Sequence, residues 1–92
     1  MLYVFCKLYV ILRYIGAKNY IKGKQRGMQF VQFDVKGRRM KQGGKIKVFY
    51  NKRKDLYNVE SWTVRGLRAK RIKIKKNISV ESLRNIIEDM VG

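Results

Sequence analysis

Apolar and polar side chains alternate along four successive runs of this chain, at 29–35, 45–50, 56–64 and 67–76. A period of two places neighbouring side chains on opposite faces of a β-strand, so each run is predicted to form a strand with one apolar face. The segments between the runs are short, which favours antiparallel neighbours joined by hairpins. The sequence therefore predicts a four-stranded antiparallel β-meander.

Residues 79–91 follow the period of a helix instead. Their apolar side chains recur at spacings that form one stripe, made of Val80, Leu83, Ile86, Ile87 and Met90. Ser79 is suited to cap this helix, because its hydroxyl can accept a hydrogen bond from an amide of the first turn. Glu88 and Asp89 stand at the negative end of the helix dipole, so we expect basic partners for them elsewhere. A helix of about 13 residues is marginal alone, so its stripe should cover one face of the sheet in a small α+β domain.

The first 27 residues leave two alternatives open. They are apolar and rich in tyrosine up to residue 15, and end in a polar run at 22–27. In one interpretation, 2–15 forms a fifth strand or a buried core helix. In the other, translation begins at Met28 and the native protein is the single domain 28–92. AT-rich DNA would encode the residue types of such a leader by default, and a purine-rich ribosome-binding site just before Met28 would encode residues 24–27.

No part of the chain is predicted to enter a membrane. Lys7 and Arg13 interrupt the apolar run at 2–15, whereas a spanning helix needs about 20 largely apolar residues. The run also lacks the charge order and cleavage site of a secretory signal. Cys6 is the single cysteine, which rules out an intramolecular disulfide and suits a reducing compartment. We therefore expect a soluble cytoplasmic protein.

The charge is far from balanced. The chain has 23 Lys and Arg but 6 Asp and Glu, a formal net charge of +17. So much like charge raises the free energy of a compact state by self-repulsion, and a polyanion relieves it. Solubility alone is usually met by a net charge of about 2–8. Nucleic acid, either RNA or single-stranded DNA, is the expected partner, because releasing its counterions favours binding further.

One face of the predicted sheet combines cations with aromatic rings. If residues 46, 48 and 50 point to the helix, Phe49 lies on the opposite face. On the next strand, either Trp62 or Tyr57 also faces away from the helix. Rings stack on bases while cations meet phosphates. The candidate residues on this face are Lys45, Lys47, Phe49, Trp62, Arg71, Lys73 and Lys75. The alternative is that Phe49 and Trp62 pack under the N-terminal segment as a second small core.

Two basic connections are further candidates for phosphate contacts, made by bidentate Arg and by the diffuse charge of Lys. The segment 37–44 is predicted to be a flexible loop, because it carries the Gly43-Gly44 pair. The segment 51–55 is predicted to be a hairpin loop. Their cations are Arg38, Arg39, Lys41, Lys52, Arg53 and Lys54. Nothing in either loop predicts which bases are recognised, so binding is expected to tolerate many sequences.

No cofactor, metal or enzymatic site is predicted. The chain has no His, one Cys and scattered acids, which disfavours a zinc site, and it has neither a phosphate-binding loop nor a GxGxxG motif. One catalytic alternative is left open, a ribonuclease toxin that stabilises its transition state with cations. Its residues would be Arg53, Lys54, Tyr57, Arg65 and Arg68.

The segment from Val48 through Asn51, a charged turn, and then Tyr57-Asn58-Val59 resembles a pattern in short, basic, uncharacterised proteins of bacteriophages and gut-bacterial mobile elements. In those proteins a Val-x-x-Asn strand end is followed, after a turn, by aromatic-Ser-Val, and Asn58 here replaces the Ser. The resemblance implies a phage or mobile-element origin and no particular activity. Two other functions therefore stay open: an inhibitor or adaptor that binds an acidic groove on a host protein, and a component of a ribonucleoprotein.

Overall fold

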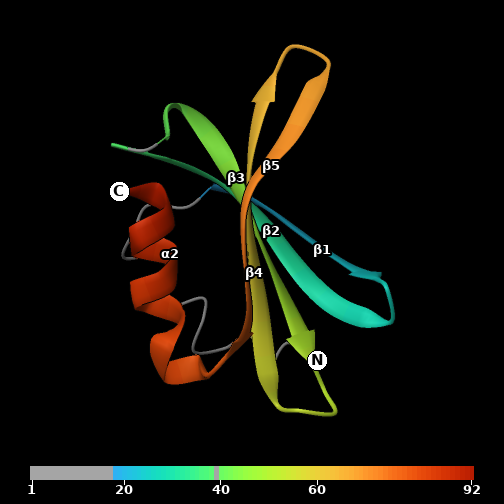
Figure 1. Ribbon diagram of the computed structural model, residues 1–92. Helices are drawn as coiled ribbons and strands as arrows, with labels where there is room; N and C mark the ends of the chain where they lie inside the picture. Colours follow the sequence, from blue (N-terminus) through green and yellow to red (C-terminus); the bar gives the residue numbers. More distant parts are fainter. Residues whose placement is uncertain (1–17, 39) are drawn as a thin grey trace.

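The computed structural model describes residues 18–38 and 40–92 and has an α+β fold (Figure 1). Five antiparallel strands form one sheet in sequence order, and a helix follows them. The elements are β1 (Lys18–Gln25), β2 (Met28–Gly37), β3 (Met40–Asn51), β4 (Leu56–Arg65), β5 (Arg68–Ile78), the 3-10 turn η2 (Val80–Ser82) and α2 (Leu83–Val91). The predicted combination of an antiparallel meander with a C-terminal helix is confirmed, but the described sheet has five strands and not four.

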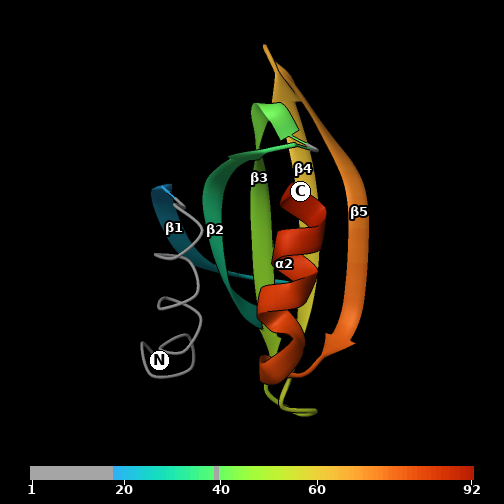
Figure 2. The same cartoon turned by 90° about the vertical axis from the view of Figure 1, so that its left-hand side faces the viewer.

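The core lies between α2 and one face of the sheet. Figure 2 shows the helix lying across the middle strands. The alternation predicted for the strands holds where they meet the helix, because every second residue there is buried. The buried apolar side chains of this core are Val31, Phe33, Val35, Ile46, Val48, Tyr57, Val59, Ile78, Leu83, Ile87 and Met90.

The fifth strand begins after the segment 2–15 and extends into the polar run at 22–27, where no strand was predicted. β1 covers Lys18–Gln25 and pairs with β2, and all eight of its residues are exposed. Arg26 and Gly27, which connect the two strands, both have positive φ angles, 55° and 73°, as in the tight turns that suit hairpins. The backbone ladder therefore holds β1 without an apolar pattern. The segment 2–15, where a fifth strand or core helix was predicted, lies outside the described residues.

The flexible loop predicted at 37–44 is wrong. β3 already begins at Met40, and Gly37 pairs with Met40 across a short turn. The Gly43-Gly44 pair lies within β3, and Gly43 has a φ of 87°, a conformation that glycine adopts at little cost. Lys45 and Trp62 form the last pair between β3 and β4 toward this end of the sheet. Beyond it the sheet divides into a β2–β3 ribbon and a β4–β5 ribbon, which diverge in Figure 1.

The β3–β4 hairpin explains the local sequence pattern around Asn51. The side-chain oxygen of Asn51 accepts hydrogen bonds from the amides of Arg53 and Lys54, at 3.1 and 3.4 Å, which fixes the turn. Tyr50 and Tyr57 face each other across the strands with ring centroids 5.2 Å apart. The Tyr50 hydroxyl donates to Asp55 at 2.7 Å, and this hydrogen bond raises the pKa of Tyr50. Residues 50–57 therefore form a hairpin that these local contacts stabilise.

The start of the helix differs from the prediction in detail. Ser79 precedes η2, but its side chain makes no capping hydrogen bond. Its backbone carbonyl accepts from the Ser82 amide at 3.0 Å instead. This first turn is a 3-10 turn, and the α-helix itself begins at Leu83. A backbone hydrogen bond, and not the Ser79 side chain, therefore stabilises the start of the helix.

Basic partners outside the helix were predicted for Glu88 and Asp89, and the structure confirms this for Asp89, whereas Glu88 pairs within α2. Asp89 lies 4.0 Å from Lys73 of β5, and Glu88 lies 3.0 Å from Arg84 one turn earlier. The first of these ion pairs ties the helix to the far strand of the sheet. None of the helices in the described ranges is long and apolar enough to span a bilayer.

The β2–β3 ribbon touches the end of α2 at Gly37. A Cβ atom at this position would lie 2.6 Å from both the Cγ1 and the carbonyl oxygen of Val91. Because the backbone of Val91 cannot rotate away as a side chain can, Gly37→Ala should lower the free energy of unfolding by about 1–3 kcal/mol. Urea unfolding measures the loss. Lys36→Ala, at the exposed neighbouring position, is the matched control and should change stability by less than about 0.5 kcal/mol. Equal stability of the two variants would contradict this close contact.

Candidate nucleic-acid interface

The cations predicted on the last strand do not share one face. β5 has register shifts against β4 between Tyr57 and Val59 and between Ser61 and Trp62. Each shift inserts one extra residue into β5 and so reverses the alternation of its side chains. Paired residues share a face, and Arg71 pairs with Trp62 whereas Lys73 pairs with Ser61. Arg71 therefore lies on the face remote from the helix, which we call the outer face.

Lys73 and Lys75 lie on the helix side, contrary to the prediction. Lys75 pairs with the core residue Val59, and Lys73 reaches Asp89 of α2. The prediction failed because it carried a strict period of two from Arg71 to Lys75 through the shift that lies between Arg71 and Lys73. Neither shift coincides with Gly or Pro, the residues that most often signal an irregular strand, although Asn77, inside the first, has a φ of 58°.

Phe49 lies on the outer face, as predicted, but it is not exposed. Only 1% of its surface reaches solvent. Its ring packs against Phe30 with centroids 5.7 Å apart. The Arg26 guanidinium lies 5.0 Å from the Phe49 centroid, and the Lys47 ammonium lies 4.5 Å from that of Phe30. The alternative of a second small core is therefore confirmed for Phe49, with Arg26 as part of its cover, and Phe49 is not available to stack on a base.

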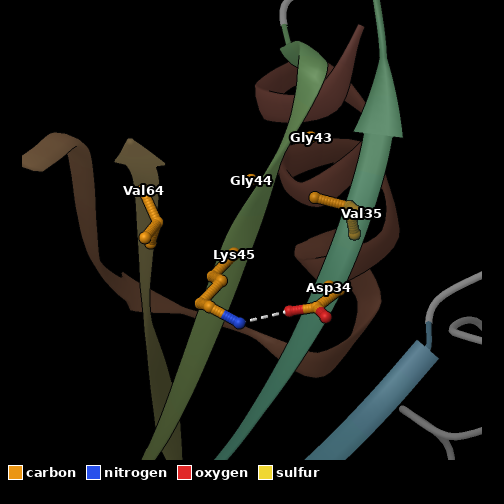
Figure 3. A pocket seen from close by; sticks show the side chains of 6 residues that line it. All are labelled: Asp34, Val35, Gly43, Gly44, Lys45 and Val64. Carbon is orange, nitrogen blue, oxygen red and sulfur yellow. Dashed lines mark hydrogen bonds and ion pairs between the residues drawn. The ribbon is translucent and has the colours of Figure 1, made fainter. Parts of the chain in front are cut away.

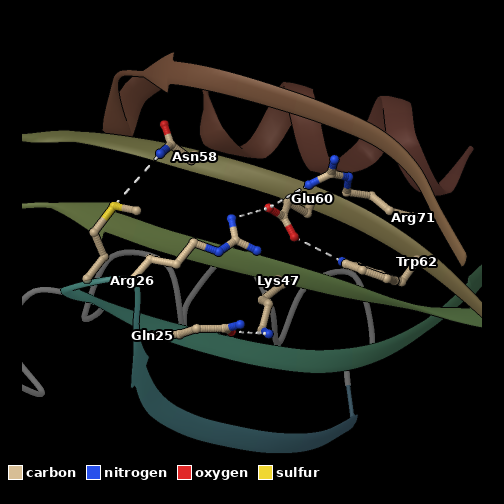
Figure 4. A network of polar contacts seen from close by, with 8 residues as sticks. Gln25, Arg26, Lys47, Asn58, Glu60, Trp62 and Arg71 are labelled. Carbon is tan, nitrogen blue, oxygen red and sulfur yellow. Dashed lines mark hydrogen bonds and ion pairs between the residues drawn. The ribbon is translucent and has the colours of Figure 1, made fainter. Parts of the chain in front are cut away.

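Glu60 gathers the charged and aromatic groups around it on the outer face (Figure 4). Its side chain is 1% exposed, and its Oε2 lies 3.1 Å from Arg26 and 3.6 Å from Arg71. The indole N–H of Trp62 donates to Oε1 at 3.1 Å. The half-buried Trp62 is thus oriented by a carboxylate. The charge of Arg71 is partly compensated, because Arg71 shares this carboxylate with Arg26. Glu60 was not selected as a site residue from the sequence. The one feature of the sequence that could have indicated it is the presence of an acidic residue in a strand of a strongly basic chain.

Lys45 and Lys47 are engaged within the molecule as well. Lys45 forms an ion pair with Asp34, which also accepts a hydrogen bond from Asn19 at 2.8 Å. These hydrogen bonds, that of Lys45 first, hold the pKa of Asp34 below its usual value. Lys47 donates to Gln25 at 2.6 Å. The carboxylates of Asp34 and Glu60 therefore offset part of the positive charge at the centre of the outer face, which makes this part a weaker phosphate platform than predicted.

Several exposed cations that form no ion pair among the described residues lie near the two ends of the sheet. All six acids lie in the described residues, and their ion pairs engage Arg26, Lys45, Arg71, Lys73 and Arg84. The β3–β4 turn, at one end, carries Lys52, Arg53 and Lys54, all exposed. The opposite end carries the exposed cations Lys36, Arg38, Arg65, Arg68 and Lys70. Arg39 and the side chain of Lys41, both predicted to bind phosphate, lie outside the described part of the structure.

An open hollow of about 320 Å³ lies where the two ribbons separate (Figure 3). It exists because Gly43 and Gly44 present no side chains between Val35 and Val64. Asp34 points into it toward Lys45. Because this carboxylate would repel a phosphate, the hollow is unsuited to an anionic group.

The five residues considered for a ribonuclease do not lie together. Arg53 and Lys54 are at the β3–β4 turn, whereas Arg65 and Arg68 are at the far end of β4 and the start of β5. Ten residues of β4 separate these ends, a length of about 30 Å. Tyr57 points into the core, where burial raises its pKa. Among residues 18–38 and 40–92, no group of three Cys, Asp or Glu side chains is placed to hold a metal ion.

Comparison of the chain with protein-family models, with curated proteins and with solved structures finds no match.

The Glu60 cluster should contribute to stability through its charge. Glu60→Gln keeps an acceptor for Trp62 but removes the charge shared by Arg26 and Arg71. Since both guanidinium groups are about half exposed, we expect a loss of about 1–2 kcal/mol, less than for a fully buried pair. Urea unfolding followed by the emission of the single Trp measures it. Glu81→Gln, at an exposed position of η2, is the control. Two variants as stable as the parent would show that Glu60 is not needed as a charge.

Proposed function

We propose that this protein binds nucleic acid, tolerating many sequences, and acts without catalysis through phosphate contacts from Lys and Arg side chains. The observation that carries the proposal is the position of its uncompensated cations. The ion pairs of the described residues offset part of the charge at the centre of the outer face. The exposed cations near the two ends of the sheet have no such partner, and a polyphosphate supplies one.

The energetics favour a polyanion over small anions. With a net charge of +17 on 92 residues, the folded chain repels itself, and a ligand that carries many negative charges relieves this repulsion in a single binding event. A nucleic acid also releases condensed counterions when Lys and Arg replace them, which adds a favourable entropy. Phosphate contacts carry no base information, which accounts for the proposed tolerance of sequence.

The burial of Phe49 changes the balance between the two expected kinds of contact. A stacking platform for single strands requires rings that bases can reach, and Phe49 is covered. Trp62 is the partly exposed ring left among the candidates, and its indole N–H is held by Glu60. The proposal therefore rests on phosphate contacts, with base stacking in a minor role.

Binding should weaken steeply with salt. If six or more phosphates are contacted, the affinity for a mixed-sequence oligonucleotide should fall about 10³-fold between about 50 and 200 mM NaCl. Fluorescence anisotropy of a labelled oligonucleotide measures this dependence. An oligonucleotide of the same sequence with uncharged methylphosphonate linkages is the control and should not bind. An affinity that does not change over this range would refute the proposed mechanism.

A further inference from the structure

The β4–β5 ribbon projects beyond the rest of the sheet. After the last β3 pair at Trp62, only β5 continues beside β4, with Thr63 opposite Lys70, Val64 opposite Ala69 and Arg65 opposite Arg68. We call residues 63–70 the arm. In Figure 1 the arm is the orange hairpin that extends past the other elements. From Val64 to Ile72 every residue is exposed.

The arm lacks the support that the neighbouring ribbon has. The β2–β3 ribbon contacts the end of α2 through Gly37 and Val91. The arm instead exposes apolar side chains, with Val64 at 42% and Leu67, in the turn at its tip, at 106%. A two-stranded hairpin is only marginally stable in water by itself. When apolar side chains are exposed on such a hairpin next to cationic side chains, the surface is typical of one that a partner covers.

The pairing gives the arm two different faces. Arg65 and Arg68 are paired and share a face, and Lys70 shares it too because it pairs with Thr63, two residues before Arg65 on the same strand. Val64 and Ala69 are paired on the opposite face. One side of the arm is therefore cationic and the other apolar, with Leu67 at the tip.

The dimensions of the arm fit one class of nucleic acid. The arm extends four residues beyond Trp62, to Gly66, which corresponds to a length of about 13 Å. The major groove of B-form DNA is about 12 Å wide and 8.5 Å deep and admits a two-stranded ribbon, whereas the minor groove, at about 6 Å, is too narrow. The major groove of A-form RNA is too narrow for side chains to enter. Single strands are typically held by aromatic rings, and residues 63–70 include none.

We propose that the arm inserts into the major groove of duplex DNA. This inference rests on the proposed function and names its partner. Arg65, Arg68 and Lys70 contact phosphates at the groove wall, while Val64 and Leu67 face the base edges. The thymine methyl group is the apolar feature of that groove, so Leu67 favours thymine at a single position and the rest of the sequence can vary.

The test compares two variants that lose the same charge at opposite ends of the sheet. The arm variant carries Arg65→Gln, Arg68→Gln and Lys70→Gln, and the turn variant carries Lys52→Gln, Arg53→Gln and Lys54→Gln. Each is titrated by anisotropy against a DNA duplex, an RNA duplex and a DNA single strand of matched sequence, about 20 nucleotides long. We expect the arm variant to lose about tenfold more affinity for the DNA duplex than the turn variant. The two variants should lose equal affinity for the RNA duplex and for the single strand.

Leu67→Ser tests the arm without changing its charge. It should weaken binding to the DNA duplex about threefold, as expected for one lost apolar contact to thymine, and should leave single-strand binding unchanged. The effect should disappear on a duplex in which uracil replaces thymine, because the methyl group is then missing. All substituted positions are exposed, and thermal unfolding verifies that each variant is folded.

The outcomes separate the two proposals. If the arm and turn variants lose equal affinity for all three ligands, the arm has no special role, although the protein still binds nucleic acid. A larger effect of the arm on the RNA duplex or the single strand would also overturn the inference. If the parent protein binds none of the three, the proposed function itself fails.

Discussion

A mismatch in length between the helix and the strands governs this structure. α2 has 9 residues and β3 has 12, which correspond to about 14 Å of helix and 40 Å of strand. One short helix can cover only part of such strands. Leu83, Ile87 and Met90 bury that part, and the strands continue beyond the apolar layer. Those ends are therefore wet, and there the sequence places cations instead of core residues.

The helix does not cover the outer face. The centre of this face is covered instead by a small aromatic contact between Phe30 and Phe49 and by the charged cluster around Glu60. The negative charge of a carboxylate that is 1% exposed must be compensated by nearby cations. Arg26, next to the edge strand β1, and Arg71, in the edge strand β5, provide these cations. Partial compensation of charge at the centre and charge excess at the ends are thus two results of one arrangement.

The sequence predicted the parts of the fold that depend on local periodicity. The strands that meet the helix and the stripe of α2 are confirmed because burial on one face imposes a period that can be counted. β1 was missed because an edge strand held by backbone pairing needs no apolar pattern. Gly43 and Gly44 are typical of a turn, yet here they let β3 bend away from β4 within a continuous ladder with β2.

The candidate site was less predictable, since it depends on long-range register. The shifts in β5 place Lys73 and Lys75 on the helix side, and no residue nearby announces the shift at Ile72. The burial of Phe49 required knowing that Arg26, 23 positions earlier in the chain, folds back over its ring. The hairpin loop predicted at 51–55 is confirmed, because the Asn51 side chain fixes a turn through local hydrogen bonds.

The two edge strands of the described sheet, β1 and β5, both carry several lysines. β1 has Lys18, Lys22 and Lys24, and β5 has lysines at 70, 73, 75 and 76. Two copies that approached strand to strand, to extend the sheet from one molecule to the next, would bring like charges together. This protection against self-association is electrostatic, so it is strongest in dilute salt and weakens as ionic strength rises.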